Sequence, residues 1–361
     1  MKILQISAGR ERSVALAENG TAYGWGAFKK LTPIPASDFA DAICSSDASE
    51  IGHNRFAQPR PHILNPNAPF ATVADGYVDT LGVRRGGGVL SCRPLIAPQW
   101  GAAHAPVRDL PPGTAQVALT ESGAFALQAD GTVWSWGMNV HGQLGRATPA
   151  LYSDAAAIDG LAPIAQIAAG HGHMLALDRD GSVWSWGSNS AGQLGTGSLA
   201  AQTKPARVAF PEPIRHVAAG DTHSFALDVD GRLWAWGANN HGQTGDGTER
   251  YYTRPVRIKI GFPVAQIDAG MFYTAALSAQ GEVFAWGWNG LGQTGRESPA
   301  SSPQPVRIKP LAHITRIAAG SGHVLATDGA AVFAWGDNRS AACGTAPARA
   351  IQPQPLPVSF A

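Results

Sequence analysis

Charged residues are scarce in this chain of 361 residues, and the scarcity excludes some classes of function. Only 15% of the residues are Asp, Glu, Lys or Arg, and the formal net charge is +1. So small a net charge creates no long-range field that could hold DNA or an anionic membrane. We therefore expect neither a nucleic acid nor a membrane as a partner.

Cysteine and long apolar runs are also nearly missing. Cys44, Cys92 and Cys343 lie far apart and form no CxxC pair, which argues against a disulfide framework and against a zinc site. No run of 18 apolar residues is present, and the N-terminus lacks the apolar stretch of a secretory signal peptide. We expect a cytoplasmic protein, or one exported by a route that needs no such signal.

Glycine and proline, in contrast, are abundant, and the spacing of the tryptophans shows that the chain is built from repeats. The chain holds 43 glycines and 26 prolines, a composition typical of many short strands joined by tight turns. From position 136 onward tryptophans recur every 50 residues, and the last follows after 49. Each is followed by glycine, and they are Trp136, Trp186, Trp236, Trp286 and Trp335. A fixed period of this length indicates a repeat architecture.

Two further motifs keep the same period. An Ala-Gly motif, often followed by histidine, stands before the last four of these Trp-Gly pairs, and a Gly-Gln loop such as HGQLG from His141 follows the first four. The copy at 117–137, which holds Trp136, has lost the first glycine, and two worn copies at 6–26 and 73–93 raise the total to seven. The repeats lie near 3–64, 65–108, 109–158, 159–208, 209–258, 259–308 and 309–360.

Within a repeat, the residue pattern is that of strands. Residues 173–178 and 182–187 alternate in polarity, and Asp180-Gly181 is a hairpin turn signal. A strand opened by proline, as in 205–208, completes four antiparallel strands. Blades that cannot bury their faces alone must stack. The sequence therefore predicts an all-β fold, a seven-bladed β-propeller of four-stranded antiparallel blades forming one domain over 1–361, with termini that meet.

The quoted motifs resemble the regulator-of-chromosome-condensation repeat family, most strongly over 117–336 and in VAAGDTHSFAL at 217–227. The match is poor over an irregular insert at 27–69, which we expect to be a surface loop or a partly disordered segment. The resemblance implies a β-propeller that binds other proteins.

The search for chemistry yields no catalytic, cofactor-binding or metal-binding residue. No nucleophile–base order, phosphate loop or metal-ligand motif is present, so we predict no enzymatic turnover and no cofactor. The histidines that recur once per repeat, which we call the repeat histidines, are His173, His223 and His323. We interpret them as buried residues that bond to backbone near the next blade, rather than as a ring of bases.

Three functions stay open. Propellers present loops on flat faces, so the first hypothesis is a monomeric protein-binding scaffold. The resemblance implies a second, guanine nucleotide exchange on a small GTPase, which the family's founding member performs with an inserted hairpin wedge; the segment 27–72 is the candidate wedge. The third is inhibition of an enzyme, because one secreted β-lactamase inhibitor has this fold.

One face of the predicted propeller is unusually aromatic on one side. Loops after strands one and three emerge on the same face, and around the fifth and sixth repeats they carry aromatic side chains and arginines. Such residues dominate binding hot spots, although they could also fill gaps between loops. The charged turns of the opposite face look solvated; they hold Asp178, Arg179, Asp180, Asp228 and Asp230. The predicted partner-binding residues are Met271, Phe272, Trp288, Tyr251, Tyr252, Arg250 and Arg296.

Overall fold

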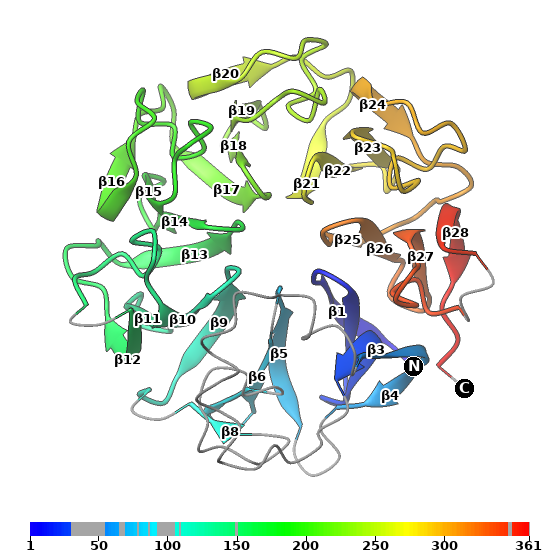
Figure 1. Ribbon diagram of the computed structural model, residues 1–361, viewed down its shortest axis with the longest axis horizontal. Coiled ribbons are helices and arrows are strands. Elements are labelled where there is room, and N and C mark those ends of the chain that lie inside the picture. The colour runs from blue at the N-terminus through cyan, green and yellow to red at the C-terminus, as the bar shows by residue number, and fades with distance from the viewer. Residues whose placement is uncertain are drawn as a thin grey trace.

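The computed structural model describes residues 1–29, 55–64, 69–77, 79–85, 87–91, 105–107, 110–148, 151–345 and 349–360. Over these residues the chain forms seven four-stranded antiparallel sheets that stand around a central axis as the blades of a propeller (Figure 1). The predicted fold is confirmed. No helix in the described ranges is long and apolar enough to cross a membrane.

The strands follow one another along the chain, four to a blade. Blade 1 holds β1 (Ile3–Ala8), β2 (Arg12–Ala17), β3 (Ala22–Lys29) and β4 (Arg55–Ile63). Blade 2 holds β5 (Phe70–Asp75), β6 (Thr80–Arg84), β7 (Val89–Ser91) and β8 (Ala105–Pro106). Blade 3 holds β9 (Thr114–Leu119), β10 (Gly123–Gln128), β11 (Val133–Met138) and β12 (Tyr152–Ala157). Blade 4 holds β13 (Ile164–Ala169), β14 (His173–Asp178), β15 (Val183–Gly187) and β16 (Gln202–Val208).

The last three blades repeat the pattern. Blade 5 holds β17 (Ile214–Ala219), β18 (His223–Asp228), β19 (Leu233–Gly237) and β20 (Tyr252–Ile258). Blade 6 holds β21 (Val264–Ala269), β22 (Tyr273–Ser278), β23 (Val283–Gly287) and β24 (Ser302–Arg307). Blade 7 holds β25 (Arg316–Ala319), β26 (His323–Thr327), β27 (Val332–Asp337) and β28 (Ile351–Pro357). In every blade the first strand is innermost and each strand pairs with its successor (Figure 1).

The Trp-Gly pair that revealed the repeat joins two blades and bends the third strand. Trp186 is fully buried, and its indole Nε1 donates to Gln143 O of blade 3 at 2.8 Å. Gly187 has a φ of 99° and stands at a register shift between β15 and β16. A Cβ there would lie 2.5 Å from Gly172 O, so only glycine fits.

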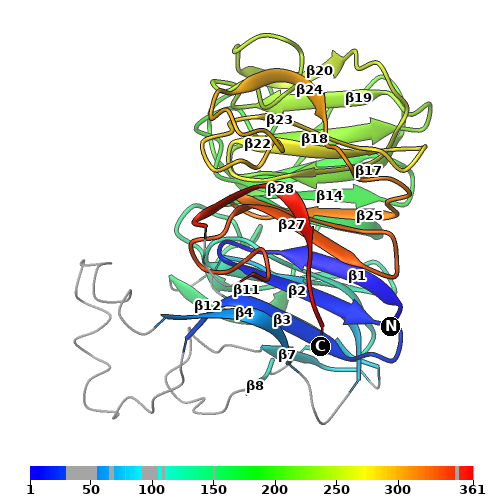
Figure 2. The same cartoon turned by 90° about the vertical axis from the view of Figure 1, so that its right-hand side faces the viewer.

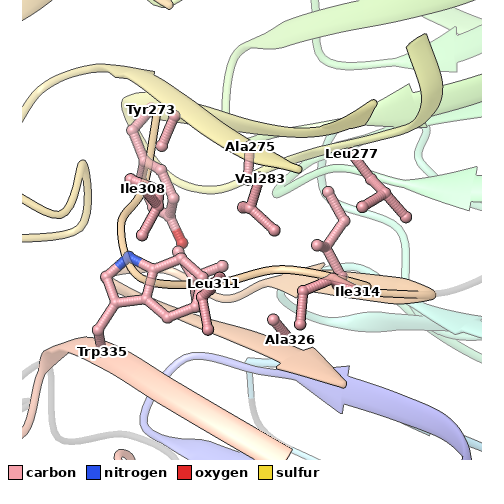
Figure 3. Close-up of a cluster of buried hydrophobic side chains, with 12 residues drawn as sticks. Tyr273, Ala275, Leu277, Val283, Ile308, Leu311, Ile314, Ala326 and Trp335 are labelled. Carbon is pink, nitrogen blue, oxygen red and sulfur yellow. The ribbon is translucent and has the colours of Figure 1, made fainter. Parts of the chain in front are cut away.

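The core lies between neighbouring blades rather than within one. The second strand is buried along its whole length in blades 4, 5 and 6. Figure 3 shows the cluster between blades 6 and 7, in which Tyr273, Leu277 and Val283 pack against Ile314 and Trp335. Each blade therefore buries its faces only when its neighbours are in place.

The ring closes between blade 7 and blade 1. Ser321 N donates to Gly9 O at 3.0 Å, and Ile3 N donates to Gly329 O at 2.8 Å. The Phe360 ring packs edge-on against Trp25 with centroids 5.8 Å apart. The two ends of the chain lie near each other in both views (Figures 1 and 2). All four strands of blade 1 come from the N-terminal end, so no blade is shared between the termini.

The insert expected over 27–69 overlaps two strands. β3 continues to Lys29, and β4 occupies Arg55–Ile63. Residues 30–54 and 65–68, which include most of the candidate wedge, lie outside the described residues.

Candidate partner-binding face

Two sets of loops share one face of the propeller, which we call the loop face. Backbone bonds join the loop after the first strand to the start of the loop after the third: Ser188 N donates to Gly172 O at 2.8 Å, and Trp288 N donates to Phe272 O at 2.9 Å. The turns between the second and third strands lie at the other end of the blades, on the turn face. There Ile214 N, at the start of blade 5, donates to Gly181 O at 2.9 Å.

The repeat histidines connect neighbouring blades beneath the loop face. All three are fully buried. His173 Nε2 lies 2.9 Å from Ser224 Oγ, and His323 Nε2 lies 2.9 Å from Ser13 Oγ. His223 Nε2 lies 3.3 Å from Thr274 Oγ1. The prediction of a buried blade-joining residue is confirmed: each ring contacts a hydroxyl side chain of the next blade, and His223 and His323 also bond that blade's backbone, at Tyr273 and Arg12.

The hydroxyl determines which nitrogen of the histidine carries the proton. Ser224 Oγ donates its single proton to Gln193 O at 2.8 Å, so it can only accept from His173 Nε2. Burial lowers the pKa of His173 to about 3, that of His223 to about 3 and that of His323 to about 4. These rings are therefore neutral at pH 7, with a structural role.

Where histidine is replaced at this position, the substitute still joins blades. Tyr273 Oη donates to Gly320 O at 2.9 Å and to His323 O at 2.7 Å. Arg12, only 3% exposed, pairs with Asp75 at 2.9 Å. The position thus serves the joint between blades whatever side chain occupies it.

Three aromatic rings meet on the loop face across the joint of blades 5 and 6. The Phe272 and Trp288 rings are 6.1 Å apart between centroids, at an angle of 81°. His241, from the Gly-Gln loop of blade 5, lies 5.3 Å from Phe272 and 6.4 Å from Trp288. We call these three residues the aromatic cluster, and all three are partly exposed.

His241 belongs to the site although the sequence reasoning did not select it. His241 opens the HGQTG motif, which indicates a loop but does not show which neighbouring loop that histidine faces. Because the Gly-Gln loop of one blade reaches the next blade's first loop, a large residue at 241 faces one at 272.

The other predicted site residues are not drawn into this cluster. Tyr252 Oη donates to the Asp246 carboxylate of its own loop, and Arg296 Nη2 donates to Ala300 O at 2.6 Å. Tyr251 is 61% exposed, and Arg250 is exposed as well. Met271 lies next to Phe272, and its backbone N donates to Ser321 O at 3.2 Å. Among the ring contacts of the described residues, none links Tyr251 or Tyr252 to the aromatic cluster.

A second group of side chains crosses the channel on the loop face, and we call it the channel-mouth cluster: Tyr77, Glu121, His171 and Asp221. Tyr77 Oη donates to Asp221 Oδ1 at 3.2 Å, and the Tyr77 and His171 ring centroids are 4.5 Å apart. His171 Nε2 lies 2.8 Å from Glu121 Oε2, and its Nδ1 lies 3.1 Å from Asp221 Oδ1. Burial and the Asp221 carboxylate raise the pKa of Tyr77, and burial raises the pKa of Asp221.

Below this cluster lies a channel of about 350 Å³, lined by the innermost strands. In blades 1, 3, 4 and 6 a glutamine of the first strand bridges its blade to the next: Gln116 Nε2 donates to Ile167 O at 2.8 Å, and Gln266 Nε2 donates to Ile317 O at 2.8 Å. Gln5 and Gln166 do the same, and we call these four residues the glutamine belt. The side-chain amides of these glutamines are therefore engaged in hydrogen bonds between neighbouring blades.

The turn face differs from expectation. Asp228 is fully buried and Asp178 is 5% exposed, so they are not solvated charges. Asp178 accepts the backbone N–H of Ser182 at 2.8 Å and the indole N–H of Trp184 at 3.1 Å. An aspartate three residues before glycine thus closes the hairpin. Asp180 and Asp230 are exposed, as predicted.

Comparison with known proteins agrees with this architecture. The sequence profile of the RCC1-like domain matches residues 41–360, and that of the regulator of chromosome condensation (RCC1) repeat matches residues 3–28. No curated protein sequence matches the chain. Similar solved structures include human WBSCR16, with a TM-score of 0.78, 24% identity and 94% coverage of each chain. Another is Prp20p of Saccharomyces cerevisiae, described with its binding to Gsp1p and histones. Its TM-score is 0.71 and its identity 22%, over 88% of this chain and 80% of that one.

Proposed function

This chain belongs to the RCC1-like family of β-propellers, and on that premise we propose that it is a protein-interaction scaffold that binds its partner through the loop face. The observation that carries the proposal is the aromatic cluster. Phe272 and Trp288 keep part of their surface exposed while touching one another and His241. Exposed aromatic groups of this kind mark interaction sites more often than single exposed apolar residues do.

The packing of the repeat does not require these rings. The position of Phe272 is held by Gly172, Thr222 and Gly322 in blades 4, 5 and 7, and those blades are built alike. Trp288 stands where blade 4 has Ser188. A side chain that the architecture can omit, and that stays partly exposed, is best explained by what it binds.

Nucleotide exchange on a small GTPase stays a prediction from the resemblance. At 22% identity, the similarity to Prp20p supports the shared fold alone. The segment that would hold a wedge lies mostly outside the described residues. Inhibition of an enzyme stays a prediction on the same footing. Identification of the captured partner distinguishes these two functions. Nucleotide exchange requires a small GTPase as the partner, and inhibition requires an enzyme.

The test is affinity capture with three forms of the purified chain, read by quantitative mass spectrometry. The first form is the wild type, the second is Phe272→Ala with Trp288→Ala, and the third is Asp180→Ala with Asp230→Ala on the turn face. A partner recovered with the wild type should be lost at least tenfold with the aromatic variant, because two hot-spot rings contribute on the order of 2 kcal/mol or more each.

The turn-face variant is the matched control, since it changes two exposed side chains of the same fold. Its partner recovery should equal that of the wild type. Loss of the partner in this variant, with full recovery in the aromatic one, would assign binding to the turn face and end the proposal. Circular dichroism melts of all three forms exclude misfolding as the cause.

A further inference from the structure

Positive charge gathers on the outer strands of blades 4, 5 and 6. β16, β20 and β24 are the outermost strands of these blades and follow one another along the outer edge of the ring (Figure 1). Residues 202–210, 252–260 and 302–310, which hold these strands and the short segments after them, contain no Asp or Glu. We call six exposed cations of these segments the basic rim: Lys204, Arg207, Arg254, Arg257, Lys259 and Lys309.

The rim is continuous from one blade to the next. Gly197 N, in a loop of blade 4, donates to Thr253 O of β20 at 2.7 Å, and Gly247 N of blade 5 donates to Pro303 O of β24 at 3.0 Å. A Cβ added to Gly197 would lie 2.5 Å from Arg254 Cζ, so this guanidinium covers the loop of the preceding blade. The six cations therefore follow one arc over three joined blades.

The charges of the rim are not neutralised by neighbouring side chains. Among the residues that the structure describes, none of the six forms an ion pair, and Arg207 alone donates a side-chain hydrogen bond, to Ser182 Oγ at 2.8 Å. Arg307, in contrast, pairs with Glu282 at 2.7 Å and is therefore not counted in the rim. The net charge of +1 thus conceals a local excess of positive charge that attracts anionic groups at short range.

Protection of the sheet edge does not account for the sign of these charges. Edge strands often carry proline and charged side chains, because both hinder pairing with another chain. β12, the outer strand of blade 3, has Asp154 as its single charged residue, and β28 of blade 7 has no charged residue. Those blades protect their edges without a cation, so the repeat does not require a positive edge.

The shape of the rim favours a flexible polypeptide over a nucleic acid. The rim lies on the convex outer edge of the ring (Figure 1), where a DNA duplex with a persistence length of about 50 nm could touch only a short arc. Single strands are bound by stacking successive bases on aromatic rings. The rings beside the rim are engaged, since Trp234 packs edge-on to Phe210 with centroids 5.9 Å apart and Phe284 stacks on Phe262 at 3.8 Å. Tyr251 is exposed, but one ring holds one base only.

The prolines of the outer strands decide how such a polypeptide binds. Pro205, Pro255 and Pro305 lack the N–H that an added strand would need, so recognition comes from side chains. We propose that the basic rim binds an acidic, extended polypeptide segment of a partner protein, whose Asp and Glu side chains pair with the six cations. This surface is separate from the loop face, and the proposal does not rest on the function proposed above.

The probe for the test is a fluorescein-labelled peptide of about 20 residues in which Glu and Ser alternate, which extends to roughly 70 Å at most. Its binding to the full chain is followed by fluorescence anisotropy at about 0.05 M salt and again at about 0.5 M salt. We expect saturable binding that weakens at least tenfold at the higher salt, because salt screens exposed charges.

A triple variant removes half of the rim. Arg257→Gln, Lys259→Gln and Lys309→Gln change exposed side chains that make no hydrogen bond or ion pair with the described part of the chain, so the fold should be kept. The affinity for the peptide should fall about tenfold, because each exposed ion pair contributes a factor of roughly two to five.

The matched control changes the net charge by the same amount elsewhere on the propeller. Arg10→Gln, Arg84→Gln and Arg316→Gln remove three exposed cations of blades 1, 2 and 7. This control should bind the peptide within twofold of the wild type. The loop-face variant, Phe272→Ala with Trp288→Ala, should also bind the peptide as the wild type does, so a failure of either proposal is distinguishable from a failure of the other.

Three results would overturn the proposal, provided that all forms melt at the temperature of the wild type. The first is no binding of the peptide to the wild type. The second is an equal loss in the rim variant and in the matched control, because the total charge alone would then matter. The third is a single-stranded oligonucleotide of the same charge that binds more tightly than the peptide and is lost in the rim variant, which would assign the rim to nucleic acid.

Discussion

The contact of His223 between blades 5 and 6 allows the role of the repeat histidines to be measured. His223→Ala removes a fully buried ring that lies against Gly220, where an added Cβ would be 2.4 Å from the histidine Cε1, and that packs edge-on to Phe225. Deleting a ring from so tight a site costs about 3–5 kcal/mol. Of this, about 1–3 kcal/mol is the hydrogen bond lost by Thr274. Equilibrium unfolding in urea, followed by tryptophan fluorescence, gives the difference.

A double-mutant cycle separates the hydrogen bond from the cavity. Thr274→Val keeps the volume but removes the hydroxyl that accepts from His223 and donates to Gln243 O at 2.7 Å. The two substitutions should be non-additive by about 1 kcal/mol. The histidine variant should bind the partner as well as the wild type does per folded molecule. A coupling near zero, or lost binding with an unchanged unfolding midpoint, would refute the structural role.

Two further predictions follow from burial and backbone geometry. Acid should destabilise the fold: the repeat histidines have pKa values of about 3 to 4 when folded against an ordinary 6.5, so the unfolded state binds more protons, and each costs up to ~2 kcal/mol at pH 5 relative to pH 7. Asp268, whose pKa burial raises to about 6, offsets part of the loss from one histidine. The urea midpoint should therefore be lower at pH 5 than at pH 7, and an unchanged or higher midpoint at pH 5 would contradict this prediction. Gly187→Ala should lower the melting temperature sharply, because the added Cβ would meet Gly172 O. Gly261→Ala, whose Cβ would enter open space, should melt at the same temperature as the wild type. Equal melting temperatures of the two variants would contradict this explanation.

Much of the fold could be predicted because its signals repeat. The Trp-Gly pairs recur every 49 or 50 residues, and Trp186, Trp236, Trp286 and Trp335 are fully buried between blades. The tryptophan bonds the neighbouring blade and the glycine fits where a Cβ would not, so both residues recur and the motif is visible in a single sequence. The partner of the repeat histidine was also visible in principle, because Ser224 and Thr274 follow His173 and His223 by 51 residues.

The channel-mouth cluster could not be predicted in this way. Tyr77, Glu121, His171 and Asp221 stand in the variable position after the first strand of four different blades, so no local pattern links them. Only closure of the ring brings them together across the channel. The burial of Asp178 could not be predicted for a related reason. An aspartate in a hairpin turn is usually exposed, and the sequence does not show that the Trp184 indole donates a hydrogen bond to it.

The most direct test of the loop face is hydrogen exchange of the chain with and without its captured partner. Binding should slow the backbone amides of residues 270–273 and 287–291, which surround Phe272 and Trp288, and should leave the hairpin amides at 179–182 and 229–232 unchanged. Slowing at those hairpins with none in the loops around the aromatic cluster would contradict the proposal that this propeller binds its partner through the loop face.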